Sequence, residues 1–384
     1  MKKLLLAGAL ATAVAVSLLL AVTGGAANGN APAAAVCPGS PLGSSHCHAL
    51  VVTDAHGNPD ATASPTGLSP TTIKSAYGFS TSSTAGAGQT VAIVDAYDDP
   101  TAESDLAVFS SQFGLSACTT ANGCFAKVNQ TGGTAVPRKN AGWALEISLD
   151  VQWAHAIAPG AKILLVEASS NSNANLYAAE DYAKAHAAYV SNSWGGSESS
   201  GENANDSHFS APGVSFFVSA GDAGLPAEYP SASPNVISVG GTTLNFTNGV
   251  LTSETGWSSG GGGCSLYETA NAAQSSFSGY AQAGCAGKRA TPDVSLDADP
   301  ASGVSVYDST SYQGQKGWFR VGGTSASSPM WAGRSADAAI LVNATTVYGA
   351  TISYRDITSG NNGAPCLVGF DLCTGRGSWI GSTP

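Results

Sequence analysis

Short apolar runs alternate with helix-like stretches from residue 67 onward, and this alternation constrains the fold more than any other feature. Residues 91–94 have the pattern of a buried strand that leads into acidic side chains, and a helical stretch at 102–113 follows. Parallel strands joined by helices are covered by helices on both faces. We therefore predict an α/β fold with a doubly wound, mostly parallel central sheet flanked by helices. The other elements expected are strands at 161–168, 188–195, 213–224 and 235–244, and helices at 140–156 and 175–188.

The remaining segments indicate one large domain, which we assign to residues 66–384. Residues 245–320 are rich in glycine and serine and predict hairpins and long loops, and short strands and turns are expected after residue 340. Neither an internal repeat nor a low-complexity linker interrupts the sequence. Its 384 residues suffice for one domain with a full hydrophobic core.

The first 27 residues have the pattern of a secretory signal peptide. Lys2 and Lys3 precede a long apolar run, and small residues follow it. A membrane anchor is the alternative, but small residues directly after the run favour cleavage. No later run is apolar enough to span a bilayer, so we expect no membrane contact after signal removal. Except for a short apolar run that ends at Val52, residues 28–65 lack a useful periodicity, and we interpret them as a short propeptide or an N-terminal arm.

The charge balance excludes one class of partner. Lys and Arg number 15 against 26 Asp and Glu, which leaves a formal charge of −11 and a sequence pI near 4.8. An acidic chain is a poor match for nucleic acid, so we expect no such partner. Charged residues make up only 11% of the chain, so few carboxylate–amine pairs would be lost at low pH.

All eight cysteines follow the signal segment, which indicates export to an oxidising compartment and disulfide bonds. Sequence alone leaves many pairings open. Short loops close most easily, so our hypothesis pairs nearest neighbours: Cys37 with Cys47, Cys118 with Cys124, Cys264 with Cys285, and Cys366 with Cys373. A metal site is weakly indicated only where His46 and His48 flank Cys47, and an exposed polar turn is the preferred interpretation there.

Residues 322–333 read GGTSASSPMWAG and place Ser325 on a tight glycine turn before an apolar run. We expect Ser325 in the first turn of a buried helix. Backbone N–H groups there lack partners and carry partial positive charge, which would stabilise an attacking oxygen and an oxyanion. Pro329 suits a first helical turn because its missing N–H costs little there. An ordinary helix cap is the alternative for a bare Gly-Thr-Ser turn.

A serine nucleophile needs a base, and the best candidate is a carboxylate pair. Glu146 and Asp150 are four residues apart on a predicted helix, so both side chains lie on one face, among apolar neighbours. A partly buried, coupled pair holds its protons tightly and titrates as a unit in the acid range. A solvated acidic face is the alternative interpretation. Among the six histidines, His56 and His155 are the candidates for a base of the usual kind.

Asp222 follows a predicted buried strand in the run FFVSAGDAG. A carboxylate aimed at an oxyanion would repel it, whereas a protonated carboxyl donates a hydrogen bond. Asp222 therefore suits an acyl-transfer site only at low pH. Taken alone, an aspartate at the end of a strand more often forms a turn.

Four motifs in this order resemble the sedolisin (serine-carboxyl peptidase) family of the subtilisin-like clan, over about residues 68–378. The resemblance implies a subtilisin-like fold and an acid-active, calcium-binding endopeptidase that acts on polypeptides, which we expect to be secreted and monomeric. It implies Ser325 as nucleophile, Glu146 as general base and then acid, Asp150 as its orienting partner, and Asp222 as oxyanion donor. It also implies Asp95 as a further acid of the network, and Trp194 on the strand that pairs with the substrate backbone.

The resemblance also implies one structural calcium ion. Asp356 and Asp371 would supply carboxylates, and Ile357, Leu367 and Gly369 would supply carbonyl oxygens. A ligand set made only of oxygen suits a hard cation. Position 367 is leucine where the family tends to have glycine, which a carbonyl ligand tolerates.

Two further departures from the family pattern keep alternatives open. Only some 40 residues separate the signal from the matching region, where the family usually has a long folded propeptide. Arg334 and Asp337 also interrupt the helix after Ser325, where a smoother apolar run is expected. One alternative is a catalytically inactive, protease-like secreted binding protein. The other is a neutral-pH subtilisin-type hydrolase with His155 or His56 as base.

Overall fold

The structure is a computed structural model that describes residues 32–381. The signal peptide predicted for residues 1–27 lies outside this range. Within it, no helix combines the length and the apolar character that a membrane crossing requires.

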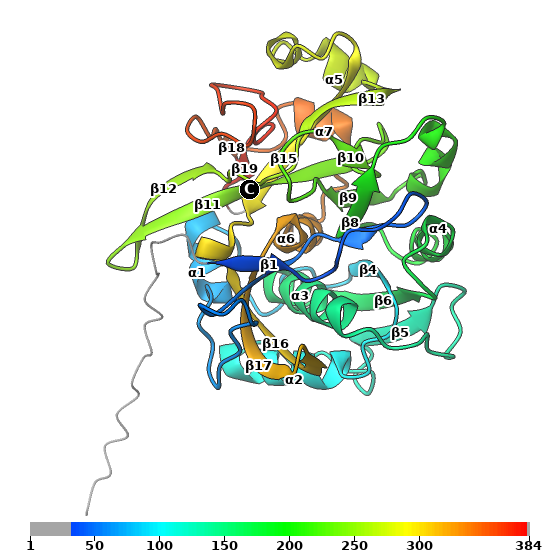
Figure 1. Ribbon diagram of the computed structural model, residues 1–384, viewed down its shortest axis with the longest axis vertical. Coiled ribbons are helices and arrows are strands. Elements are labelled where there is room, and N and C mark those ends of the chain that lie inside the picture. The colour runs from blue at the N-terminus through cyan, green and yellow to red at the C-terminus, as the bar shows by residue number, and fades with distance from the viewer. Residues whose placement is uncertain (1–31, 382–384) are drawn as a thin grey trace, which may run out of the picture.

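The central sheet has eight strands in the order β12-β11-β9-β7-β4-β6-β5, with β15 paired to β11 (Figure 1). All neighbours run parallel except β12, which forms a hairpin with β11. The strands are β4 (Thr90–Ala96), β5 (Phe125–Asn129), β6 (Lys162–Ala168), β7 (Tyr189–Asn192), β9 (Ser215–Ser219), β11 (Ile237–Thr247), β12 (Val250–Gly256) and β15 (Val294–Asp297). The sheet confirms the predicted doubly wound, mostly parallel architecture.

Two long buried helices bring the candidate site together. α3 (Ala141–Ile157) and α6 (Thr324–Ala338) pack against each other and against the sheet, and α4 (Asn173–Ala183) lies across β4 and β6 from α3 (Figure 1). α3 is capped by Asn140, whose side chain accepts the N–H groups of Gly142 and Trp143. Side chains on every face of α3 are buried, as expected of a helix enclosed on all sides.

The outer elements cover this core. α2 (Ala102–Phe113) and the hairpin of β16 (Val304–Tyr312) and β17 (Gln315–Gly322) pack on α3. The remaining elements are α1 (Pro70–Tyr77), α5 (Ala272–Ser276), α7 (Ala344–Tyr348), the paired strands β13 (Gly263–Thr269) and β14 (Lys288–Thr291), β18 (Tyr354–Arg355) and β19 (Ser378–Trp379), and three 3-10 helices at Glu202–Phe209, Tyr280–Ala283 and Pro300–Ser302.

The segment before residue 66 forms strands, although its sequence showed only one short apolar run, which ends at Val52. β1 (Ala33–Ala35) pairs with β3 (Leu50–Val52), and β3 pairs with β17. β2 (His46–Cys47) pairs antiparallel with β8 (Trp194–Ser197), which also pairs with β10 (Glu228–Tyr229). The arm is therefore built into two sheets of the domain. Its strands are only two or three residues long, so period-2 patterns cannot reveal them.

Several expected elements need correction. The strand predicted at 188–195 is two strands, β7 and β8, interrupted at Ser193. The short helix α7 stands in a region where strands and turns were expected; Asn343 and Thr346 form a capping box at its start. The helix at 102–113 has the predicted bounds and ends at Gly114, whose φ of 66° suits glycine.

All four predicted disulfides are present: Cys37–Cys47, Cys118–Cys124, Cys264–Cys285 and Cys366–Cys373. The nearest-neighbour hypothesis is thus confirmed.

Arg334 is buried on α6 and explains the interruption of its apolar face. Its guanidinium pairs with Asp337 at 2.5 Å and donates to the carbonyl of Gly381 at 2.8 Å. It also stacks on the rings of Trp379 and Phe79, with its central carbon 4.6 and 5.1 Å from their centroids. The charge is therefore paired and covered by aromatic faces, an arrangement that guanidinium groups favour.

Candidate active site

Ser325 lies in the first turn of α6 and is fully buried, as the sequence predicts. The preceding Gly323 has a φ of +96°, and a Cβ there would lie 1.9 Å from the carbonyl oxygen of His48 and 2.6 Å from Oδ2 of Asp222. Only glycine fits this turn. The Ser325 hydroxyl donates to the carbonyl of Ser193 at 3.3 Å, at the junction of β7 and β8.

Pro329 lies deeper in α6 than predicted, because the helix begins at Thr324 and Pro329 is inside it. A residue other than proline at 329 would donate its N–H to the carbonyl of Ser325. The hydroxyl of Ser193 donates to that carbonyl instead, at 3.4 Å. Ser193 therefore contacts Ser325 through both its hydroxyl and its carbonyl.

Glu146 and Asp150 lie on the face of α3 that meets the start of α6, and both are completely buried. Asp95, at the end of β4, is buried beside Asp150. None of the six carboxyl oxygens of these three residues has a hydrogen bond within residues 32–381. We expected Glu146 and Asp150 to be partly buried, but both side chains are completely buried.

Burial favours the protonated form of these carboxyls, and neighbouring negative charges add to this effect at Glu146 and Asp95. Desolvation raises the pKa of Glu146, and the charges of Asp150 and Asp95 raise it further, while the nearby Ser325 hydroxyl lowers it. Desolvation also raises the pKa of Asp150, against the opposing effect of Ser193 and Glu146. The pKa of Asp95 is raised by desolvation and then by Asp150 and Glu167. The Ser325 hydroxyl itself donates to the carbonyl of Ser193.

Asp222 approaches the start of α6 from the loop after β9. Its Oδ1 accepts hydrogen bonds from the backbone N–H and the hydroxyl of Thr324, at 2.8 and 2.9 Å. Its Oδ2 is buried without a partner in the described chain and faces the turn at Gly323. Burial raises the pKa of Asp222 to about 7, even though the charge of His48 and the Thr324 hydrogen bonds lower it. Oδ2 is thus the oxygen that carries the proton below neutral pH.

Trp194 is the first residue of β8, and its side chain is buried. Its indole N–H donates to the carbonyl of Val94 at 2.8 Å. The side chain therefore anchors β8 to β4, while the backbone of β8 pairs with β2 on one edge and β10 on the other. We expected β8 to pair with a substrate backbone, but in this structure it pairs with β2, a segment of the same chain.

Neither proposed histidine base reaches Ser325. His155 is buried near the end of α3, where Nε2 bonds to the carbonyl of Ser116 at 2.9 Å and burial lowers its pKa to about 4. His56 is exposed on a turn closed by Asp54. The ring of neither residue hydrogen-bonds to Ser325 in the described structure.

The structure adds Glu228, which the sequence did not point to, and His48, which the sequence analysis considered only for a weakly indicated metal site. His48 is buried; its Nδ1 bonds to the hydroxyl of Ser219 at 2.7 Å and its Nε2 to Glu228 at 3.0 Å. The expectation of an exposed polar turn at His46–His48 was wrong. Ligand atoms of His46, His48 and Glu228 lie within 4.8 Å of one another, but both His48 nitrogens already have partners. Because His48 and Glu228 are 180 positions apart, no local signal could have joined them.

The predicted calcium loops bring Asp356 and Asp371 close enough for the charge of Asp356 to raise the pKa of Asp371, after desolvation. Asp371 accepts the N–H of Leu367 at 2.6 Å, and Asp356 accepts that of Gly369 at 2.8 Å. The carbonyl oxygens of Ile357, Leu367 and Gly369 accept no hydrogen bond within residues 32–381. In donor chemistry, two carboxylates and carbonyl oxygens without hydrogen bonds fit a hard cation.

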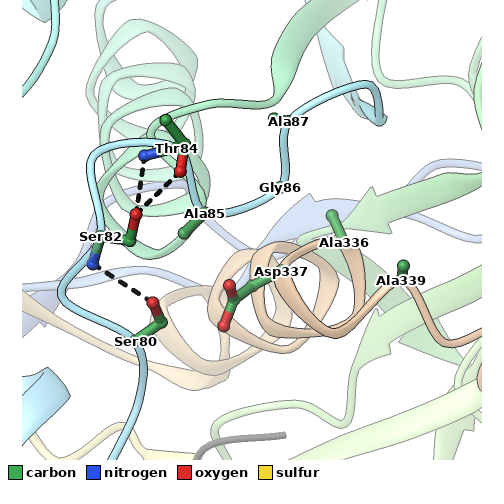
Figure 2. A pocket seen from close by; sticks show the side chains of 9 residues that line it. All are labelled: Ser80, Ser82, Thr84, Ala85, Gly86, Ala87, Ala336, Asp337 and Ala339. Carbon is green, nitrogen blue, oxygen red and sulfur yellow. Dashed lines mark hydrogen bonds between the residues drawn. The ribbon is translucent and has the colours of Figure 1, made fainter.

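A hollow elsewhere on the surface lies between the loop 80–87 and the end of α6, where Ala336, Asp337 and Ala339 line it (Figure 2). Ala336 is eleven residues from Ser325, or roughly 16 Å along the helix axis at ~1.5 Å per residue. Asp337 is the one ionisable side chain of its lining and is paired with Arg334. The hollow is therefore separate from the candidate active site.

Comparison with known proteins agrees with this geometry. The model of the subtilase family matches residues 130–348, more than half of the chain, and the chain belongs to this family. Within it, the chain is homologous to kumamolisin of Bacillus sp. (strain MN-32), with 31% identity over 376 residues that cover 83% of this chain and 63% of kumamolisin. Sedolisin of Pseudomonas sp. (strain 101) is 35% identical over 208 residues, which cover 44% of this chain and 34% of sedolisin. The chain is thus similar to members of the sedolisin branch.

A solved structure supports the same placement. Pseudomonas sedolisin, a serine-carboxyl proteinase in complex with two molecules of pseudo-iodotyrostatin, superposes with a TM-score of 0.67 at 29% identity. The match covers 83% of this chain and 96% of that one. The chain spans less than two thirds of the full length of the curated relatives it matches.

Proposed function

We propose that this protein is a secreted, acid-active serine-carboxyl endopeptidase that hydrolyses peptide bonds in polypeptides. One observation carries the proposal: Ser325 lies beside Glu146, a member of a buried carboxyl pair, and no histidine ring within residues 32–381 hydrogen-bonds to the Ser325 hydroxyl. When the pair shares one proton, the other carboxyl is ionised and can accept the proton of Ser325 at a pH where histidine would already be protonated. The sedolisin-branch relatives support the same reaction class.

Ser325 is the nucleophile, and Glu146 is the base that removes its proton. A small rotation of the hydroxyl away from Ser193 brings it to Glu146, whose pKa it already influences. Asp150 lies one helical turn from Glu146 and shares its buried environment, so it orients Glu146 and stabilises the proton that Glu146 gains. Asp95 extends this group of carboxyls behind Asp150.

Asp222 stabilises the oxyanion. Thr324 occupies its Oδ1, so the proton resides on Oδ2 and is donated toward the turn at Gly323. Attack by Ser325 on a carbonyl held at that turn places the developing negative charge next to this donor. Donation requires the acid form, which agrees with a pKa of about 7 for Asp222.

The cycle is completed by returning the proton. Glu146 donates it to the leaving amine, the carbon–nitrogen bond breaks, and an ester to Ser325 remains. A water molecule then loses a proton to Glu146 and attacks the ester, again with Asp222 facing the oxyanion. The ester bond to Ser325 then breaks while Glu146 returns the proton to the Ser325 oxygen, which releases the carboxyl product and restores both residues.

A bound calcium ion would join the two C-terminal loops and supply charge neutralisation there. Asp356 and Asp371 would hold it with the carbonyls of Ile357, Leu367 and Gly369. Their oxygen-only donor set supports this assignment. The site lies in loops distinct from the catalytic residues, so its role is structural. Secretion is supported by the signal-like N-terminus and by four disulfides, which persist in oxidising compartments.

The test is hydrolysis of a denatured protein from pH 2 to 8 with calcium present, comparing wild type with Ser325→Ala. We expect a maximum between about pH 3 and 5 and no activity in the variant. Acylation of Ser325 by an active-site probe at acid pH is a second readout. A folded wild type that neither hydrolyses protein nor acylates would favour the inactive binding protein.

A further inference from the structure

Residues 46–48 read His-Cys-His and lie extended along the edge of β8. β2 pairs antiparallel with β8, with His46 opposite Gly195 (Figure 1, blue beside β8). The N–H of His48 continues this pairing by donating to the carbonyl of Ser193 at 3.1 Å. Side chains two positions apart on an extended segment point to the same side, and the one between them points to the other. The rings of His46 and His48 accordingly lie together, with their centroids 5.1 Å apart.

Glu228 completes a group of three metal-binding side chains with these histidines. Cys47, the neighbour that the sequence offers, is excluded because its sulfur is bonded to that of Cys37. Glu228 comes instead from β10, which pairs with β8 on the edge opposite β2. One ligand atom from each of His46, His48 and Glu228 lies within 4.8 Å of the other two. The metal site weakly indicated by the sequence thus has a carboxylate where the sequence offered a sulfur.

Gly195 leaves the space in which these side chains meet. It lies on β8, between the strand that carries the histidines and the strand that carries Glu228. A Cβ at position 195 would lie 2.8 Å from Cε1 of His48 and 3.3 Å from Oε2 of Glu228. A larger residue there would push the two ligands apart, so glycine is part of the site.

The distances are close to those of a tetrahedral zinc site. Zinc binds imidazole nitrogen at ~2.0–2.1 Å and carboxylate oxygen at ~2.0–2.2 Å, so neighbouring ligand atoms lie roughly 3.4 Å apart. Nε2 of His48 and Oε2 of Glu228 are 3.0 Å apart in the hydrogen bond that joins them. An ion between them therefore requires these two atoms to separate by only roughly 0.4 Å.

Both ring nitrogens of His48 have partners, and each partner suits a metal-bound imidazole. The hydroxyl of Ser219 lies 2.7 Å from Nδ1. A hydroxyl accepts as well as donates, so it can accept Nδ1–H and leave the lone pair of Nε2 for the ion. Such a bond fixes the tautomer and the ring orientation of a metal ligand. Zinc would replace the proton between Nε2 and Glu228, which is released to solvent.

The group is also accessible to an ion from solvent. The side chain of His48 is 1% exposed, but that of Glu228 is 15% exposed, and His46 is half-buried. A water molecule can therefore occupy the fourth position. Three protein ligands with one further position for water is a common arrangement around zinc in proteins.

We propose that His46, His48 and Glu228 bind one Zn²⁺ ion, and that this ion ties the N-terminal arm to β10 across β8. Imidazole nitrogen is a good ligand for zinc, whereas calcium takes oxygen ligands. The site is therefore distinct from the proposed calcium site at Asp356 and Asp371. It follows from the ligand geometry alone and does not depend on the proposed peptidase function.

The first test is calorimetric titration of the full chain with Zn²⁺ at pH 7.5 and saturating calcium. Ser325→Ala is the background, so that the sample cannot hydrolyse itself. We expect one Zn²⁺ per chain, and at least tenfold weaker binding in Glu228→Gln and in His46→Gln, whose folding is checked by circular dichroism. The control is His208→Gln, because His208 pairs with Asp181 at 2.9 Å outside this group and should not affect binding.

Two results of this titration would overturn the proposal. One is the absence of zinc binding to the folded chain. The other is binding that Glu228→Gln and His46→Gln leave unchanged, which would place the ion elsewhere.

The second test identifies the ligands and the tie. X-ray absorption of the zinc complex should show nitrogen and oxygen at ~2.0–2.2 Å and no sulfur at ~2.3 Å. A sulfur ligand would overturn the assigned set in favour of Cys47. Hydrogen exchange at the amides of residues 45–49 should slow at least tenfold with zinc, and not in Glu228→Gln. Zinc binding without this protection would overturn the claim that the ion ties the arm to β10.

Discussion

Thr324 donates both its backbone N–H and its hydroxyl to the same oxygen of Asp222, at 2.8 and 2.9 Å. The second carboxyl oxygen has no partner within residues 32–381 and faces the turn at Gly323. Asp222 is thereby fixed in one orientation, with one oxygen that accepts and one that is free to hold a proton. In the proposed mechanism, Thr324 therefore determines which oxygen of Asp222 is the hydrogen-bond donor.

This orientation predicts that Asp222→Asn remains active and that Asp222→Ala does not. An asparagine accepts from Thr324 with its oxygen and donates with its amide, whereas alanine removes the donor and should cost about 10²–10³-fold in kcat. The wild type should lose activity as pH rises through the Asp222 pKa of about 7. An amide does not titrate, so Asp222→Asn should lack that loss. Rates of peptide hydrolysis from pH 3 to 8 measure both effects; equal profiles in wild type and Asp222→Asn would remove Asp222 from the oxyanion site.

Glu146 and Asp150 should behave as one unit. Glu146→Gln removes the base and is expected to lower kcat by about 10²–10⁴-fold. Once the base is gone, its orienting partner has nothing to act on. The double variant with Asp150→Asn should therefore be no slower than the worse single variant. Single-turnover rates on one peptide substrate provide the comparison. If the two losses multiplied, the residues would act independently.

Much of this site follows from local sequence patterns. The spacing of Glu146 and Asp150 puts both on one helical face, and the glycine turn before Ser325 marks the start of α6. The alternation of strands and helices predicts the central sheet because each unit is contiguous in the sequence. Pairings between distant segments leave no such pattern.

The contacts of the arm show where sequence patterns stop. β3 pairs with β17, about 270 residues later in the chain. Neither strand has a sequence pattern that points to the other. Likewise, the partners that bury His48 come from β9 and β10. Arg334 looked out of place on α6 because the rings that cover it, on Phe79 and Trp379, come from other parts of the chain. Burial of such residues is a property of the assembled fold.

Calcium removal should lower the thermal stability by emptying the proposed site at Asp356 and Asp371. Saturation of a site at about 100 times its Kd stabilises the folded state by about 2.7 kcal/mol, which corresponds to a Tm change of several degrees. We expect excess EGTA to lower the Tm of wild type by this amount and to leave Asp356→Asn almost unchanged. Asp356 is exposed, so its substitution should not itself disturb the core. Equal EGTA shifts in both proteins would place the ion elsewhere.

The protein should be most stable in acid and lose stability toward pH 8. Burial raises the pKa of Glu180 and of Glu167 to about 8, far above the value of an unfolded glutamate near 4.5. Between these values the folded state holds protons that the unfolded state has released, so stability falls as pH rises. Each such group contributes a slope of up to about 1.4 kcal/mol per pH unit.

Substitution of Glu180 tests this directly, because its carboxyl is completely buried. Glu180→Gln should flatten the decline in unfolding free energy between pH 5 and 8, measured by urea denaturation. The exposed Asp60→Asn is the control and should leave the slope unchanged. Stability that rises from pH 5 to 8 in wild type would contradict the assigned direction.

Removal of Arg334 alone should lower the unfolding free energy more than removal of both Arg334 and Asp337. Arg334→Met leaves Asp337 without its 2.5 Å partner and frees the carbonyl of Gly381, so we expect a loss of about 3–5 kcal/mol in unfolding free energy. Adding Asp337→Leu removes the stranded charge and should recover part of that loss, since a buried charge without a partner is the main penalty. Urea denaturation of the wild type, both single variants and the double variant gives the coupling energy. A coupling near zero would mean that the aromatic rings around the guanidinium, rather than Asp337, hold Arg334 in place.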